Sequence, residues 1–224
     1  MKTNLFLLLA AILFFTACNK NDSNPNTTSN AYINTNAGSS WTYHETDSSA
    51  ATPSNSDYTV TSTSQDSTIN GKKYHVYNYS NGGNEYLSHT GSDYYQYDSI
   101  PVSGGVNIDR LYLKDNASVG TTWSQSFTLS IPNAPIPVPI TLTNKVVEKG
   151  ISRIVNGTSY SNVTHVSSSI SSSLIPSSSF SSSINGYYAP NYGMIESSTV
   201  IQLNYLGLTE NVNISTKLTG SSLK

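Results

Sequence analysis

The sequence predicts an all-β protein, folded as a single antiparallel barrel or sandwich of about 10 to 13 strands. After residue 31 the chain is rich in Ser, Thr, Tyr, Val and Ile and poor in Ala, Leu, Glu and Lys, which favours strands over helices. Apolar and polar residues alternate over residues 74–79, 108–113 and 200–205. Turn signals separate such stretches, and they are Asn70-Gly71, Asn81-Gly82-Gly83, Ser103-Gly104-Gly105, Asn156-Gly157 and Asn185-Gly186.

The first 17 residues have the pattern of an export signal. Lys2 precedes a continuously apolar run over residues 5–15. This run lies within the ~7–15 residues of a signal-peptide core and is shorter than the ~20 residues that a transmembrane helix needs. We therefore predict that residues 1–17 are a signal peptide, and that the mature chain begins at Cys18.

The residues around the only cysteine indicate a lipid anchor. Phe15-Thr16-Ala17-Cys18 resembles the lipobox of bacterial lipoproteins. The resemblance implies a diacylglycerol on the sulfur of Cys18 and an acyl group on its new amino group, and two or three such chains anchor a protein stably. It makes the membrane a predicted partner and the outer membrane the predicted location, with the periplasmic or cell-surface facing left open.

The mature chain divides into a tether and one domain. Residues 18–31 comprise Cys18 and a polar stretch with almost nothing to bury, as expected of a flexible tether. Residues 32–224 form the predicted all-β domain. They contain no second thiol, which excludes disulfides and cysteine-based zinc or catalytic sites. A formal net charge of -2 without a basic patch predicts no nucleic-acid partner.

Two motifs recur in the same order in the two halves of this domain. Gly38-Ser39-Ser40-Trp41 returns as Gly120-Thr121-Thr122-Trp123, and Asn70-Gly71-Lys72-Lys73-Tyr74 returns as Asn156-Gly157-Thr158-Ser159-Tyr160. The spacing suggests two duplicated halves, at about residues 32–115 and 116–224. The alternative is coincidence, because each motif is short and Asn-Gly is a common turn.

Two segments of unusual composition predict particular strands. The alternate prolines 135, 137 and 139 predict an edge strand whose apolar face carries Ile136, Val138 and Ile140; a polyproline ligand is the alternative. The serine-rich stretch 167–183 predicts two strands around Pro176, with serine on the polar face. We expect this hairpin to be the least stable of the domain.

Short motifs along the mature chain resemble a group of uncharacterised Bacteroidota lipoproteins. The shared features are the lipobox, the Asn/Ser-rich tether, and three motifs, here Gly38-Ser39-Ser40-Trp41-Thr42-Tyr43, Asn156-Gly157-Thr158-Ser159-Tyr160 and Tyr188-Ala189-Pro190-Asn191-Tyr192-Gly193-Met194-Ile195. The chain is similar, more distantly, to the open β-barrels of the lipoprotein-localisation factors. That likeness implies an apolar hollow that holds acyl chains.

Motifs for catalysis are absent from the sequence. The four histidines, His44, His75, His89 and His165, are scattered without metal-ligand spacing, and no G-x-S-x-G elbow or phosphate-binding loop occurs. His75 and His165 are expected to be strand histidines with satisfied hydrogen bonds. We predict no enzyme activity, no catalytic residue, no metal and no cofactor.

Tyrosine is the candidate for ligand contact, because the chain contains 16 of them. Alternation makes Tyr77 with Tyr79, and Tyr95 with Tyr97, same-face pairs that could stack on sugar rings. The alternative is that they form ordinary half-buried sheet positions. Asp66-Ser67-Thr68 and Asp98-Ser99-Ile100 are similar to the O-glycosylation acceptor of Bacteroidota envelope proteins, which marks Ser67 and Ser99 as candidate modification sites.

These observations predict a membrane-anchored envelope lipoprotein that acts as a non-enzymatic binding or structural module. Two alternatives compete for the ligand. A carrier of an apolar ligand, such as a lipid, predicts a cavity lined by the aliphatic faces of the strands. A glycan-binding surface module predicts a solid core and exposed same-face tyrosines.

Overall fold

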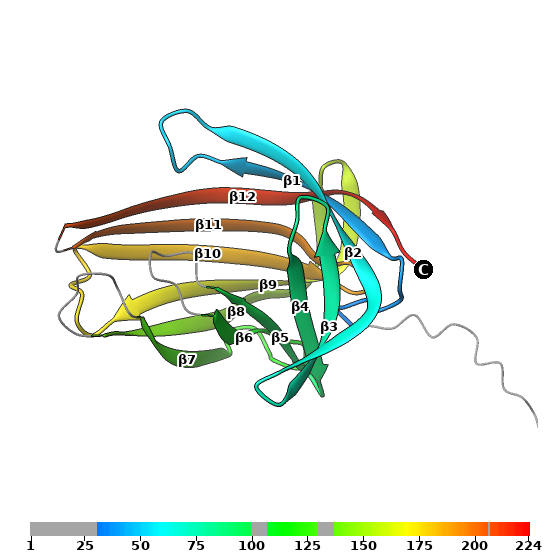
Figure 1. The fold of residues 1–224 in the computed structure, drawn as a ribbon, viewed down its shortest axis with the longest axis horizontal. Helices are drawn as coiled ribbons and strands as arrows, with labels where there is room; N and C mark the ends of the chain where they lie inside the picture. Colours follow the sequence, from blue (N-terminus) through cyan, green and yellow to red (C-terminus); the bar gives the residue numbers. More distant parts are fainter. Residues whose placement is uncertain (1–30, 100–106, 130–136, 206) are drawn as a thin grey trace, which may run out of the picture.

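The computed structural model describes residues 31–99, 107–129, 137–205 and 207–224, and all regular structure among them is β (Figure 1). The strands are β1 (Ser40–Asp47), β2 (Ser54–Ile69), β3 (Lys72–Tyr79), β4 (Asn84–Thr90), β5 (Asp93–Ser99), β6 (Asn107–Lys114), β7 (Thr122–Leu129), β8 (Val138–Val155), β9 (Thr158–Ser172), β10 (Phe180–Ala189), β11 (Gly193–Tyr205) and β12 (Leu208–Ser222). Among the described residues, no helix is both long and apolar enough to span a membrane.

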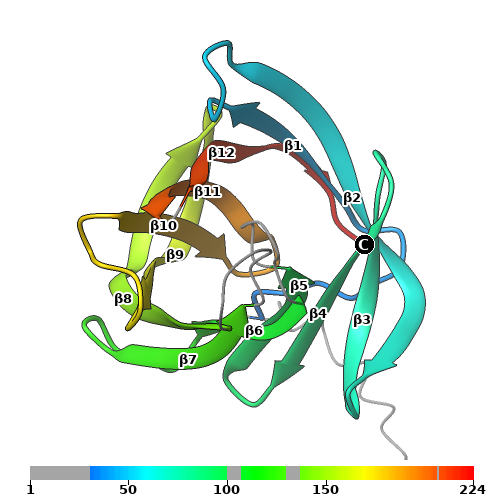
Figure 2. The same ribbon diagram turned by 60° about the vertical axis from the view of Figure 1, so that its left-hand side comes forward.

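All twelve strands belong to one antiparallel sheet, in the order β6-β5-β4-β3-β2-β1-β12-β11-β10-β9-β8-β7. Strands adjacent in sequence pair with one another, except β6 and β7, and the first strand, β1, also pairs with the last, β12. The twist of such a long sheet curls it on itself, so that β6 and β7 come together at the two edges (Figure 2). The predicted all-β fold is confirmed, in the barrel form of the two that the sequence left open, and its strand number falls within the predicted range.

The seam between β6 and β7 is closed by side chains of β7. The Trp123 indole Nε1–H donates to the backbone oxygen of Leu111 at 2.8 Å. The Leu111 N–H donates to Gln125 Oε1 at 2.7 Å, and Gln125 Nε2 donates to the Asp109 oxygen at 2.8 Å. These bonds replace a backbone ladder, because an unpaired edge would leave polar groups without partners.

The two Asn-Gly hairpins form as predicted. Asn70 and Gly71 connect β2 to β3 with φ of 50° and 80°, and Asn156 and Gly157 connect β8 to β9 with φ of 47° and 80°. Positive φ at both central residues is the two-residue turn that matches the twist of the strands.

The turn predicted at Asn185-Gly186 is wrong, since both residues lie inside β10. A Cβ at position 186 would come within 3 Å of the Tyr188 ring, so any larger residue there would displace that ring. Asn185 Oδ1 accepts a hydrogen bond from His165 Nε2, on the neighbouring strand, at 3.0 Å. Packing and side-chain bonding therefore override the local turn signal.

The two proposed halves begin with the same backbone contact. The Gly38 N–H donates to the Ser62 oxygen and the Gly120 N–H donates to the Val146 oxygen, each at 2.8 Å. Both glycines have positive φ, 83° and 89°. Each half contributes six strands, and the predicted boundary near residue 115 lies between β6 and β7. Duplication itself remains a prediction.

The prediction of an edge strand around the alternate prolines is wrong for the residues that the structure describes. Val138 and Ile140 are buried as expected, but they begin β8, which lies between β7 and β9. Pro139 has no N–H to donate, and it is tolerated there because β8 pairs with β9 only from Ile140 onward. Residues 130–136 lie outside the described part.

The serine-rich hairpin follows its prediction. β9 ends at Ser172 and β10 begins at Phe180, with Pro176 in the connection. The aliphatic members Ile170 and Ile175 are buried. Its low stability remains a prediction.

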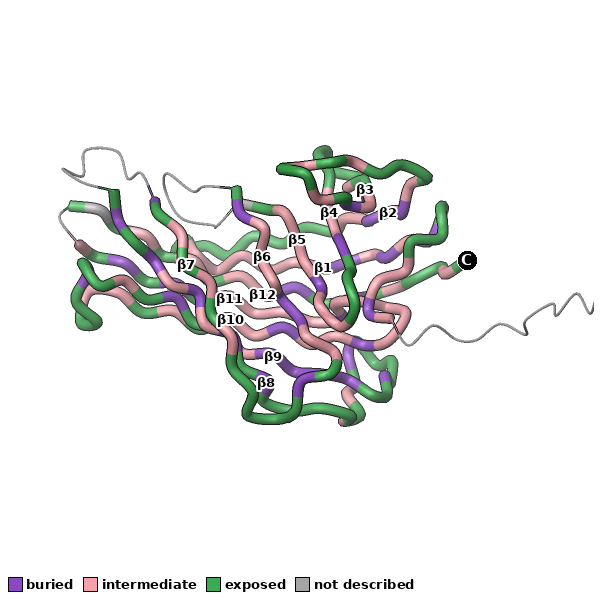
Figure 3. Tube along the Cα trace, turned by 90° about the horizontal axis from the view of Figure 1, so that it is seen from below, coloured by how far each residue is buried: buried purple, intermediate pink, exposed green. Residues whose placement is uncertain are grey.

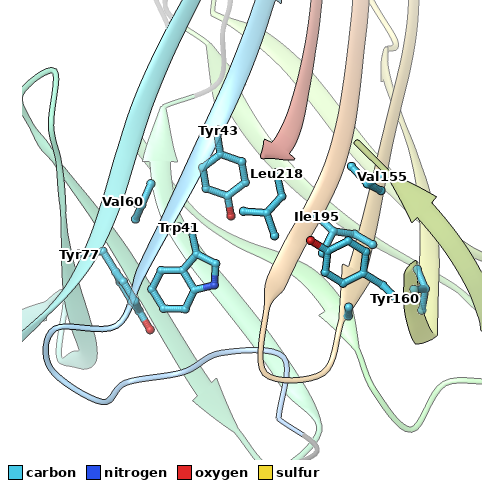
Figure 4. Packing of buried hydrophobic residues seen from close by; sticks show 10 residues of the cluster. Trp41, Tyr43, Val60, Tyr77, Val155, Tyr160, Ile195 and Leu218 are labelled. Carbon is cyan, nitrogen blue, oxygen red and sulfur yellow. The ribbon is translucent and has the colours of Figure 1, made fainter. Parts of the chain in front are cut away.

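The interior is packed in two different ways. The aromatic end holds Trp41, Tyr43 and Tyr77 on β1 and β3, packed with aliphatic side chains such as Ile195 and Leu218 (Figure 4). The other end holds an aliphatic cluster from β6 to β11, with Ile140 and Ile201 among its buried members. Buried and exposed positions follow one another along the strands, as alternation requires (Figure 3).

Candidate functional site

A cavity of about 140 Å³ lies in the aromatic end of the barrel. Eight tyrosines and Trp41 line it, together with a few aliphatic and polar side chains. Most of these residues come from β1 to β6, the first half of the domain. The cavity is therefore a property of one half more than of the other.

Strand alternation places the aromatic wall. Trp41 and Tyr43 are two residues apart on β1, and Tyr77 and Tyr79 are two residues apart on β3, so each pair faces the interior. The hydroxyl of Tyr43 donates to the Met194 oxygen at 2.9 Å, which ties the wall to β11. The rings of this wall enclose the cavity, and their hydroxyl groups lie within reach of polar partners.

A row of polar side chains crosses the same wall on three neighbouring strands. Glu85 is on β4, Gln96 on β5 and Arg110 on β6, and Gln96 is directly paired with Arg110 in the sheet. Gln96 Nε2 donates to Glu85 Oε1 at 2.9 Å, and Arg110 Nη2 donates to Gln96 Oε1. The glutamine thus links a carboxyl group to a guanidinium inside the barrel.

Glu85 titrates near neutrality. Burial inside the barrel raises the pKa of its carboxyl group to about 7, and the negative charge of Asp98 raises it further, while Arg110 and the Gln96 hydrogen bond oppose the shift. A carboxyl group with such a pKa changes its charge within the physiological range.

Two hydrogen-bond donors at this cavity have no partner among the described residues. The indole Nε1–H of Trp41 is one, in a side chain whose residue is only 4% exposed. The Nε–H of Arg110 is the other. Arg110 also has no ion pair with a carboxylate in the described part of the chain, whereas Arg153 pairs with Glu196 at 2.7 Å. Buried donors normally have partners, so a molecule that supplies acceptors would complete the site.

The four tyrosines singled out from the sequence lie on opposite faces of the sheet. Tyr77 and Tyr79 line the cavity. Tyr95 and Tyr97 alternate with Gln96, which faces the cavity, so they point outward. The Lys72 ammonium lies 2.7 Å from the centre of the Tyr95 ring, so one face of that ring is already occupied.

The predicted modification sites are placed only in part. Ser67 lies in β2 opposite Tyr74, next to Asp66, and is partly exposed. Ser99 is the last residue of β5, and its side chain lies outside the described part, as does Cys18.

A serine, a histidine and an aspartate form a hydrogen-bonded chain at β2 and β3. His75 Nε2 lies 2.9 Å from Ser62 Oγ, and His75 Nδ1 lies 3.0 Å from Asp66 Oδ1. The order matches that of a serine-hydrolase triad, but Ser62 is only 1% exposed. A nucleophile must reach its substrate, so in this conformation the hydrogen-bonded arrangement of Ser62, His75 and Asp66 has a structural role.

The second buried histidine is also satisfied. His165 Nδ1 lies 3.2 Å from Glu148 Oε2, and its Nε2 lies 3.0 Å from Asn185 Oδ1. The expectation of hydrogen-bonded strand histidines is therefore confirmed for His75 and His165. Among the described residues, no three His, Cys, Asp or Glu side chains gather as a metal site requires.

Sequence reasoning missed the row of Glu85, Gln96 and Arg110. A signal was present in β6, where Arg110 stands between Ile108 and Tyr112 at the inward-facing positions. A charged residue in phase with buried apolar ones indicates an interior polar group.

Comparison with known proteins gives two similar structures. No protein-family model matches the chain, and no curated protein matches it. A solved structure of a candidate lipoprotein from Parabacteroides distasonis matches with a TM-score of 0.46 and 10% identity, over 85% of this chain and 98% of that one. A candidate exported protein with a YmcC-like fold from Bacteroides fragilis matches with a TM-score of 0.42 and 11% identity, over the same shares. Similarity at this level supports no functional conclusion.

Proposed function

We propose that this protein is a lipid-anchored envelope module without enzyme activity that binds one small molecule inside its barrel. The observation that carries the proposal is the tyrosine-lined cavity with two donors, Trp41 Nε1–H and Arg110 Nε–H, that no described residue accepts from. A concave site with aromatic walls and a few convergent polar groups is the usual form of a small-molecule site.

The size of the cavity limits the ligand. Its volume of about 140 Å³ is close to the ~150 Å³ of an engineered apolar cavity that takes up benzene. One six-membered ring fills such a space, whereas an acyl chain or an oligosaccharide would extend beyond it. The walls are also aromatic and partly polar, unlike the aliphatic hollow expected of a lipid carrier.

The absence of catalysis is part of the proposal. Ser62, in the hydrogen-bonded chain with His75, is buried and does not line the cavity. Glu85 alone offers an acid or base there, without a nucleophile beside it. A hydrolase therefore has less support than a binding module.

The anchor is proposed from the sequence around Cys18. Replacing Cys18 by Ser should move the protein from the membrane fraction to the soluble fraction. A variant that still fractionates with membranes would contradict the anchor and leave the cavity argument intact.

Native mass spectrometry tests the binding function. We expect the protein purified from cells that produce it naturally to carry a mass excess of one small molecule, released on denaturation. Leu87→Trp, which places a larger side chain in the cavity wall, should remove the excess, and Val200→Trp on the exposed side of β11 should not. A bare polypeptide mass, or an excess that survives Leu87→Trp, would overturn the proposal.

A further inference from the structure

The two arginines of the chain differ in how their charges are satisfied. Arg153 donates from Nε to Glu196 at 2.7 Å, and its guanidinium stacks 3.3 Å from the centre of the Tyr187 ring. Arg110 lines the cavity, and within the described part of the chain it donates only to the neutral amide of Gln96 and keeps its Nε–H unpartnered. A cation inside a barrel without a paired anion is costly, and an anionic ligand is what would complete it.

The two tryptophans differ in the same way. Trp123 donates its indole N–H to the Leu111 oxygen across the seam at 2.8 Å. Trp41 is more deeply buried, lines the cavity and has no acceptor for its N–H among the described residues. The missing acceptor and the missing anion therefore belong to one cavity, where a single carboxylate could serve both donors.

We infer that the ligand is a molecule of one six-membered ring that carries a carboxylate, with its carboxylate oxygens accepting from Arg110 and Trp41 and its ring packed between tyrosines. This inference rests on the proposed function and names the ligand class of that cavity. Aromatic acids and sugar acids share this chemistry, since both present a ring face and a carboxylate.

The polar row is compatible with an anionic ligand. Gln96 stands between Glu85 and Arg110, so the carboxyl group of Glu85 does not pair directly with the guanidinium. Because burial already raises the pKa of Glu85 to about 7, a nearby ligand anion can be accommodated by protonation of Glu85. The other charged group acting on Glu85 is Asp98, which favours the same protonated form.

Calorimetric titration of residues 18–224 carrying Cys18→Ser, at pH 6, tests the inference. The probes are benzoate and glucuronate, each with its neutral counterpart, benzyl alcohol and glucose. We expect at least one acid to bind at least tenfold more tightly than its counterpart. Benzoate binding alone would identify an aromatic acid as the source, and glucuronate binding alone a sugar acid.

Matched variants test whether the ligand carboxylate contacts Arg110 and Trp41. Arg110→Gln should lower acid affinity at least tenfold, to that of the neutral probe, and Trp41→Phe should lower it several-fold. Arg153→Gln and Trp123→Phe, which change the partnered members of each pair, should leave the affinity within twofold. Acid binding that is unaffected by Arg110→Gln would overturn the inference.

The indole N–H signals provide a readout that needs no change to the interior. With two tryptophans in the chain, a ¹H–¹⁵N spectrum contains two indole signals, and the signal lost in Trp123→Phe identifies the other as Trp41. We expect the acid to shift the Trp41 signal and not the Trp123 signal. If neutral rings bind as well as acids, this inference fails and the proposed function stands. If no probe binds, the inference also fails, and the native mass measurement then tests the proposed function by itself.

Discussion

The two halves of the barrel contain similar residues and use them differently. Each half has one tryptophan and one arginine, Trp41 and Arg110 in the first, Trp123 and Arg153 in the second. The second-half pair is bonded to protein acceptors, and the first-half pair lines a cavity with donors that have no partner in the described ranges. The difference supports the proposal that the first half holds a ligand, whereas the partnered side chains of the second half act within the fold.

Side-chain chemistry explains why the cavity lies in the first half. Eleven of the 16 tyrosines fall within residues 32–115, whereas the aliphatic cluster draws mainly on β7 to β11. Tyrosine and tryptophan carry a polar group that usually finds a hydrogen-bond partner when the side chain is buried. The cavity lies where such rings, rather than aliphatic side chains, face the interior.

The largest expected effect comes from shortening one side chain at each end of the barrel. Ile201→Ala removes a side chain that is 0% exposed in the aliphatic cluster, and it should lower the free energy of unfolding by about 4 kcal/mol. Leu87→Ala, at the wall of the existing cavity, should cost about 1–2 kcal/mol because fewer contacts are lost. Urea denaturation measures both, and equal losses would contradict the difference in packing.

Glu85 gives the next largest effect. Its pKa rises from 4.5 in the unfolded chain to about 7 in the fold, so between these values the folded state binds more protons and stability falls as pH rises. Above pH 7 the full penalty is about 3 kcal/mol. Glu85→Gln should therefore stabilise the ligand-free protein by up to about 3 kcal/mol at pH 8, and by much less at pH 5.

Glu148→Gln is the second-half control for that measurement. The Glu148 side chain is 46% exposed and contacts His165 at the surface, and such a pair is worth at most about 1 kcal/mol. Denaturation at the two pH values separates the cases. A Glu85→Gln variant that is no more stable than the parent at pH 8 would show that Glu85 is not held in a destabilising interior site.

The seam where the halves meet comes third. Gln125→Met keeps the length of the side chain and removes its bonds to Leu111 and Asp109, so it should cost about 2 kcal/mol. Hydrogen exchange at the Leu111 amide should accelerate as well. Ser124→Ala, at the neighbouring exposed position, serves as control, and equal exchange rates in the two variants would mean that side chains do not close the barrel.

The sequence was sufficient for the strands and insufficient for the cavity. Alternation and Asn-Gly turns depend on nearby residues, and they predicted an all-β barrel or sandwich and the hairpins at Asn70 and Asn156. The polar row depends on strands β4 to β6 pairing in one register, which one sequence does not reveal. The turn predicted at Gly186 was wrong for the same reason. The Tyr188 ring that packs against this glycine is positioned by the fold.

The smallest expected effect concerns the one arrangement in the first half that resembles an active site. Ser62→Ala removes a hydrogen bond to His75 and should lower stability by about 1 kcal/mol. Because Ser62 is only 1% exposed, a fluorophosphonate should leave the parent protein unlabelled, as detected by intact mass. Labelling that disappears in Ser62→Ala would show that the barrel opens at β2 and presents a nucleophile. The first half would then be the site of a reaction as well as of binding.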